Sequence, residues 1–125
     1  MDATQLLAIR AKARRIWVDL EPRGKRVAVE ALSPKSAAAL SRSASGKSVV
    51  EQSIVFAESQ ARDWEGFTEA DIITSGASDD VDFDAALWAD LLAEPKHMAW
   101  ARSVFEKLQE RFAEDLKAAE QDAKN

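Results

Sequence analysis

The strongest constraint on the fold is a stretch near the start of the chain in which the hydrophobic period is two. Apolar residues occupy every second position over 16–20 and again over 27–31. Between the two runs, Glu21-Pro22-Arg23-Gly24 contains the proline and the glycine that tight turns favour. The pattern predicts a β-hairpin with one apolar face. Because an isolated hairpin is marginal in water, helices must cover that face or another chain must pair with its edge.

Segments in which apolar residues recur at helical spacing precede and follow the hairpin. Residues 2–15 predict a short helix with a small apolar face, which would at most dock as an arm and would fray in solution. Ser33 and Pro34 predict the start of a second helix that ends near Leu40. Residues 48–63 predict a third helix, with an apolar seam at spacings of four and three. The seam consists of Val50, Ile54, Ala57, Ala61 and Trp64.

The C-terminal half adds two more helices after an irregular stretch over 67–81. One helix is predicted to begin near Asp82 or Asp84, and the last to run from Pro95 to about Glu120. Together the elements predict an α+β fold in which an N-terminal β-hairpin packs on a mostly helical bundle of three to five helices. We expect a helical arm at 1–15, a single domain at 16–120 and a frayed tail at 121–125. The predicted core residues are Trp64, Phe83, Leu87, Phe105, Leu108 and Phe112.

The composition narrows the classes of function. The 125 residues include no cysteine and one histidine, so disulfides, thiolate metal sites and cysteine nucleophiles are excluded, and a Ser/His/Asp triad is hard to build. The histidine, His97, is expected at the surface or as a capping residue. No apolar run approaches the ~18 residues of a membrane span, and no signal peptide is predicted. We expect a cytoplasmic protein that is not an enzyme, with no catalytic residue, metal, cofactor or membrane partner.

The net charge of −5 conceals an asymmetry along the chain. Residues 1–50 contain 10 Lys/Arg against 4 Asp/Glu, a charge of +6, whereas residues 51–125 contain 7 against 18, a charge of −11. The two halves can attract one another within the fold, offer different surfaces to two partners, or support head-to-tail association of copies. A homo-oligomer is therefore one of the expected possibilities.

Two motifs match nucleotide- and cation-binding loops only in part. Ser45-Gly46-Lys47-Ser48 matches the end of a P-loop, but that loop requires a glycine where the chain has Ser41, and it follows a strand rather than a helix. This motif predicts a flexible loop that leads into a helix. The acidic run 79–84 matches the first half of a calcium loop and lacks the glycine and glutamate that complete it. It predicts a solvated helix start.

The aromatic residues supply the first candidates for a binding surface. The chain has four tryptophans and no tyrosine. Trp17 falls on the polar side of its strand, and Trp88 and Trp100 fall near the edges of helical stripes, where aromatic side chains often anchor partners. The alternatives are that all four tryptophans complete the core, and that Trp17 packs under the N-terminal arm. The predicted partner-binding residues are Trp17, Val50, Ile54, Trp88 and Trp100.

The order of the elements, together with two short phrases, resembles a known family. The phrases are Asp63-Trp64-Glu65-Gly66-Phe67 and Val81-Asp82-Phe83-Asp84. Over about residues 15–115 the chain resembles the tail assembly chaperones, or minor tail proteins, of tailed bacteriophages and prophages. It departs from their pattern in its longer segment before Ile16, and in Ser75-Gly76 where the loop usually has an Asp-Gly turn.

The resemblance implies a non-catalytic role in tail assembly. Proteins of this family bind the long, helical tape measure protein, and sometimes the tail tube subunit, in the cytoplasm of the infected bacterium, and they are absent from the finished virion. For this chain we expect an apolar groove that accepts a partner helix, lined by the seam of residues 48–63 with Trp88 and Trp100.

Two other functions remain open. The chain could be a structural part of the virion, such as a head–tail connector or a minor tail protein. It could instead be a host-directed regulatory or nucleic-acid-binding protein that uses the basic residues of segment 1–15. A pI of about 4.9 argues against nucleic acid as the partner, because such proteins usually present a strongly basic surface.

Overall fold

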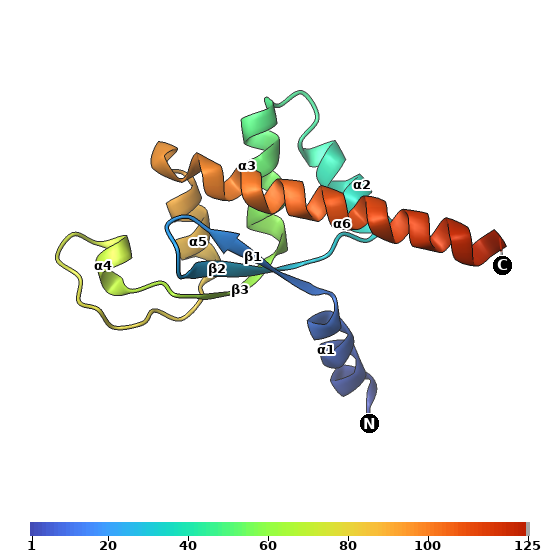
Figure 1. Ribbon diagram of the computed structural model, residues 1–125, viewed down its shortest axis with the longest axis horizontal. Coiled ribbons are helices and arrows are strands. Elements are labelled where there is room, and N and C mark those ends of the chain that lie inside the picture. Colours follow the sequence, from blue (N-terminus) through green and yellow to red (C-terminus); the bar gives the residue numbers. More distant parts are fainter. Residues whose placement is uncertain (125) are drawn as a thin grey trace.

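A three-stranded antiparallel sheet lies beneath a layer of crossing helices in the computed structural model, which describes residues 1–124 (Figure 1). The strands are β1 (Arg15–Leu20), β2 (Lys25–Glu30) and β3 (Ala61–Glu65), with β2 in the centre. The helices are α1 (Ala3–Ala13), α2 (Pro34–Ser43), α3 (Val49–Gln60), α4 (Glu69–Ile72), α5 (Ala85–Leu92), the 3-10 turn η1 (Pro95–His97) and α6 (Met98–Lys124). The expected α+β fold with an N-terminal hairpin is confirmed.

The hairpin has the predicted inward face. Val18 pairs with Val27, and Ile16 pairs with Val29. Val18, Val27 and Val29 are buried beneath the helices, whereas Ile16 is half-buried at the edge of the core. The apolar alternation in the sequence therefore corresponds to the face of the sheet that packs on the helical layer.

The third strand contradicts the predicted helix over 48–63, because α3 ends at Gln60 and the chain continues as β3. Ala61 and Trp64 are both buried, although residues three apart in a regular strand face opposite sides. A bulge explains this: Ala28 pairs with Asp63 and the next residue of β2, Val29, pairs with Ala61, so Arg62 is the extra residue. Because of the bulge, two buried residues of this strand lie three positions apart in the sequence, and that spacing is also typical of the buried face of a helix.

Other boundaries differ more modestly from the predictions. β2 runs over Lys25–Glu30, two residues earlier than the apolar alternation indicated. The stretch predicted as irregular contains the short helix α4 and a bridge between Thr68 and Asp80. α5 begins as predicted, with the Asp84 carboxylate accepting the backbone N–H of Leu87 at 2.9 Å.

The final helix is longer than expected. α6 continues through Lys124, beyond the predicted end near Glu120, and Asn125 lies outside the described residues. The frayed tail at 121–125 stays a prediction. Its last turns project beyond the body of the protein (Figure 1). At the other end, η1 and the first turns of α6 pack on α5, because Trp100 and Ala101 are buried there.

An aromatic cluster fills the centre of the core, and it includes two predicted partner anchors. Trp88 is 0% exposed and its indole N–H donates to the carbonyl of Ala57 at 3.1 Å. Trp100 is 6% exposed, stacks on Trp88 with ring centres 6.1 Å apart, and donates to the carbonyl of Glu21. The expectation that these two tryptophans are partly exposed is therefore wrong. They lie under the hairpin turn and α3, contacts that helical periodicity alone does not reveal.

The residues predicted as core fall into two groups. Trp64 and Leu108 are buried. The other four are only partly buried and pack against the edge of the core, namely Phe83, Leu87, Phe105 and Phe112.

The two phrases that carry the family resemblance meet in the structure. Trp64 stacks on Phe67 with ring centres 4.2 Å apart, and Phe83 packs edge-on against Trp64 at 5.4 Å. The indole N–H of Trp64 donates to the carbonyl of Val81 at 2.7 Å, and the N–H of Val81 donates to the carbonyl of Phe67 at 2.9 Å. The phrases thus form one structural unit that closes the loop between β3 and α5.

Asp71 connects the loop between β3 and α5 to the β1–β2 hairpin. Its carboxylate accepts the backbone N–H of Thr68 at 2.8 Å and the Thr68 hydroxyl at 2.9 Å, and it lies 3.0 Å from the Lys25 ammonium. Burial raises the pKa of Asp71, but the hydrogen bonds from Thr68 and the charge of Lys25 together lower it more, so the net pKa is below the ordinary value.

We expect Asp71→Asn to lower the free energy of unfolding by about 1 kcal/mol at neutral pH, since the carboxylate is only partly shielded from solvent. Because the folded pKa is lowered, this stabilisation is complete above the unfolded pKa of about 4 and is lost as the pH falls through the folded value. Urea unfolding of both proteins from neutral to acidic pH measures the difference. Asp80→Asn, in the same loop, is the control and should leave stability unchanged. A difference between wild type and Asp71→Asn that persists undiminished in acid would contradict this assignment.

Candidate functional site

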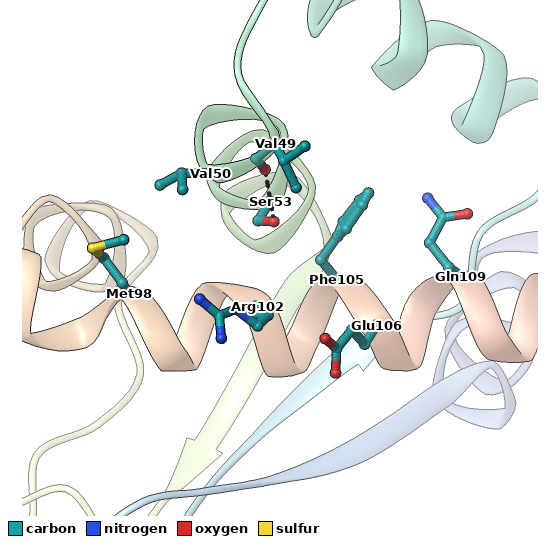
Figure 2. A pocket seen from close by; sticks show the side chains of 8 residues that line it. All are labelled: Val49, Val50, Ser53, Met98, Arg102, Phe105, Glu106 and Gln109. Carbon is teal, nitrogen blue, oxygen red and sulfur yellow. Dashed lines mark hydrogen bonds between the residues drawn. The ribbon is translucent and has the colours of Figure 1, made fainter.

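An apolar groove lies where α3 crosses α6 (Figure 2). Its volume is about 470 Å³, and its walls come from the first turns of α3 and from α6 between Met98 and Gln109. Val49 and Val50 point into it from α3, opposite Met98 and Phe105 on α6 (Figure 2). Val49 is 74% exposed and Val50 and Met98 are each 41% exposed, so the groove presents apolar surface to solvent.

Local sequence places these apolar residues at the start of α3. The hydroxyl of Ser48 accepts the backbone N–H of Glu51 at 3.2 Å and thereby begins the helix at Val49. The next turn contributes Ser53, whose hydroxyl donates to the carbonyl of Val49 at 2.9 Å. Because that hydroxyl already has a partner within the helix, Ser53 adds a polar atom to the groove without requiring a polar group from a ligand.

Phe105 gives the groove a fixed wall. Its ring packs edge-on against Phe56 of α3, with centres 4.9 Å apart. Phe56 is itself buried, so the position of Phe105 is set by the core. The α6 side of the groove is therefore formed before any partner binds, which reduces the entropy that binding must overcome.

Polar side chains border the apolar floor. Arg102, Glu106 and Gln109 line the α6 side of the groove and provide a cation, an anion and an amide within three turns of one helix (Figure 2). An apolar centre with a polar rim is the usual composition of a protein–protein contact surface. The arrangement suits a segment that has one apolar face and charged residues beside it.

The structure separates the five residues predicted to bind a partner. Val50 lines the groove, whereas Ile54, one turn later on α3, is partly buried and packs against the core. Trp88 and Trp100 lie in the core, as described above. Trp17 is 37% exposed and lies outside the groove, on the outer face of the sheet. The predicted surface is therefore reduced to Val50 within the groove and Trp17 apart from it.

Trp17 belongs to a polar surface. The Arg26 guanidinium lies 4.2 Å from the centre of its ring, and Arg26 also pairs with Glu65 of β3 at 2.7 Å. The hydrogen bond from Arg26 lowers the pKa of Glu65, and the same bond raises the pKa of Arg26. The row Trp17–Arg26–Glu65 crosses all three strands, so it connects the strands on the outer face of the sheet.

Val49, Met98 and Phe105 are groove residues that sequence reasoning did not assign to binding. Val49 lies beside the predicted seam, and Met98 follows Pro95 at the start of a helix. The sequence feature that could have indicated the groove is an apolar residue in the first turn of each of two long helices, where the neighbouring residues are not yet part of the core. Only the crossing of α3 and α6 shows that these first turns face one another.

The other motifs have structural roles. Ser48, the last residue of the P-loop-like motif, caps α3, and the motif follows α2 rather than a strand. Asp84 caps α5. His97 is buried rather than at the surface, and it has the alternative, capping role: its Nδ1 donates to the carbonyl of Leu91, in the last turn of α5, at 2.7 Å. Its ring stacks on that of Trp100, with ring centres 3.8 Å apart. Within residues 1–124, no group of three or more acidic or histidine side chains is placed to hold a metal ion.

Comparison with protein-family models, with curated proteins and with solved structures yields no match to this chain. In the part of the chain that the structure describes, none of the helices combines the length and the apolar character needed to span a bilayer.

Proposed function

We propose that this chain is a non-catalytic binding protein whose α3–α6 groove holds the apolar face of a partner helix. The observation that supports this most directly is the exposure of Val49, Val50 and Met98 around one groove. Contiguous apolar surface on a folded protein usually marks a contact with another molecule. A groove between two helices accepts a third helix readily, through residues at helical spacing on one of its faces.

Further support comes from the resemblance described above. We propose that the protein acts as a phage or prophage tail assembly chaperone, and that its partner is the tape measure protein, with the tail tube subunit as a second partner. A tape measure protein is long and helical, so its apolar helix faces need cover until the tube forms around it. The net charge of −5 would help to keep the loaded complex dispersed. In this role the protein acts in the cytoplasm of the infected bacterium and leaves before the virion is complete.

Val50→Glu tests the groove directly. We expect this variant to weaken binding to helical fragments of the tape measure protein at least roughly tenfold, because a carboxylate would be buried against the apolar face of the partner. Its thermal unfolding should match that of the wild type, since Val50 is exposed. A pull-down with overlapping fragments, followed by titration of the strongest binder, provides the measurement.

Leu116→Gln is the matched control. Leu116 is an exposed apolar residue of α6 that does not line the groove, so this variant should bind like the wild type. Equal binding by Val50→Glu and the wild type would reject the groove as the site. Immunoblotting of purified mature tails separates the chaperone from a structural virion component, since only the latter should remain in the particle.

A further inference from the structure

The helix α1 buries none of its residues against the rest of residues 1–124. Over Ala3–Ala13 it has no buried residue, and four large apolar side chains of the arm are exposed, namely Met1, Leu6, Leu7 and Ile9. An isolated helix of 11 residues is marginal in water, because so few turns do not compensate for nucleation. In Figure 1 it projects from the start of β1, away from α3 and α6. A surface that covers Leu6 and Ile9 would therefore stabilise this helix.

The exposed apolar residues of the protein are concentrated in two places. Of the ten large apolar side chains exposed within residues 1–124, four belong to the α1 arm and three to the α3–α6 groove. One surface is a convex helix and the other is a concave groove. Their lengths also match: α1 has 11 residues, about 16 Å, and the α6 side of the groove runs from Met98 to Gln109, which is also about 16 Å.

We infer that in the free protein α1 of one copy occupies the α3–α6 groove of a second copy, and that a client helix displaces it. The inference rests on the proposed function only for the second part, in which arm and client compete for one groove. Leu6 and Ile9 lie three residues apart on one helix face and would meet Val50 and Phe105 of the other copy.

The arm is held so that it cannot reach the groove of its own chain. A single residue, Arg14, joins α1 to β1. Its carbonyl accepts the N–H of Ala31 at 2.8 Å, and its guanidinium pairs with Glu30 at 2.9 Å. A joint this short, fixed at both the backbone and the side chain, holds α1 away from the helical layer, so the groove it fills belongs to another molecule.

Charge favours an arm in a groove over two arms packed together. Segment 1–15 contains Arg10, Lys12, Arg14 and Arg15 against the single acid Asp2, so two arms repel one another. The charged residues that line the groove are one anion, Glu106, and one cation, Arg102, so the groove has no net positive charge to repel a basic arm. The Glu106 carboxylate on its rim gives the basic residues of the arm a group of opposite charge. The contact joins two different surfaces, so two copies can exchange arms in a closed dimer or further copies can continue head-to-tail.

Sedimentation velocity of the full chain over a range of concentrations tests the inference. We expect the wild-type mass to rise above the 13.7 kDa of one chain as concentration increases. The double variant Leu6→Gln/Ile9→Gln removes the arm contact, and Val50→Glu removes the groove contact. Each variant alone should lose association at least about tenfold and stay at the monomer mass. At a concentration low enough for the wild type to be monomeric, both should keep its melting temperature, because the altered side chains are exposed.

Mixing the two variants distinguishes an arm–groove contact from a contact of arm with arm or of groove with groove. The Val50→Glu protein retains an intact arm and the double variant retains an intact groove, so an equimolar mixture should form a one-to-one dimer. Leu116→Gln should assemble like the wild type. A wild type that stays monomeric at every concentration, an arm variant that assembles normally, or a mixture that forms no dimer would each overturn the inference.

A tape measure fragment added to the assembled wild type separates this inference from the proposed function. Dissociation into complexes of one chain with one fragment supports both. A fragment that binds through Val50 to a monomeric wild type leaves the proposed function standing and rejects the arm contact. Assembly that passes the mixing test, together with no binding of any fragment, leaves the arm contact standing and rejects the proposed partner.

Discussion

Trp88→Ala is expected to lower the free energy of unfolding by about 3–5 kcal/mol, enough to unfold a domain of marginal stability. The indole is fully buried, packs near Trp64, Phe67 and Trp100, and donates its N–H to the carbonyl of Ala57. Alanine would leave a cavity at the junction of α3, α5 and α6, and it would leave the Ala57 carbonyl without this donor. Thermal and urea unfolding followed by circular dichroism measure the loss.

Trp17→Ala is the matched control for this substitution. The same atoms are removed, but Trp17 is partly exposed on the outer face of the sheet and loses mainly its contact with Arg26. We expect a cost of about 1 kcal/mol or less. Similar costs for the two tryptophans would show that Trp88 is not the centre of the core.

Gly66→Ala is expected to destabilise the domain by about 3 kcal/mol or more. Gly66 has a φ of +83°, in the left-handed region that residues with a side chain avoid, and a Cβ atom there would overlap the backbone carbonyl of Gly24. Neither partner is a flexible side chain that can turn away. The turn of the hairpin and the end of β3 would have to separate, which would disturb the adjacent Trp64 and Phe67.

Gly46→Ala is the control that separates the effect of the close approach between Gly66 and Gly24 from the effect of the backbone conformation. Gly46 also has a positive φ, +79°, but a Cβ atom there would meet no atom within 4 Å. Its substitution should cost only the backbone conformational energy, about 1–2 kcal/mol. Unfolding of both variants in urea gives the comparison. If the two glycine substitutions lower the free energy of unfolding equally, the close approach between Gly66 and Gly24 does not contribute to the effect of Gly66→Ala.

The parts of the fold that follow from local pattern were predictable. The alternation over 16–20 and 27–31 gave the hairpin and its buried face, and Asp84 gave the start of α5 through its capping side chain. The strand β3 was not predictable in this way. The bulge at Arg62 places Ala61 and Trp64 on the same side at a spacing of three, so the sequence over 48–63 is continuous with a helical pattern. Only pairing with β2 distinguishes the two.

The α3–α6 groove could be predicted only in part, for a similar reason. Val50 was accessible to sequence reasoning, because the α3 seam indicates an apolar face. Trp88 and Trp100 lie near the edges of their helical stripes, and they are buried because the hairpin turn and α3 approach them from distant parts of the sequence. The exposure of an aromatic residue at the edge of an apolar helical stripe depends on neighbours that are distant in the sequence. Helical periodicity does not specify those neighbours.

The bond between the Trp100 indole and the Glu21 carbonyl has a consequence for synthesis of the protein. It joins residues 79 positions apart, and the buried core extends from Val18 to Leu108. The hairpin therefore emerges from the ribosome long before the side chains that cover it exist, and no early portion of the nascent chain contains a finished core. Because the groove needs both α3 and α6, it forms only after the chain has been synthesised beyond Gln109.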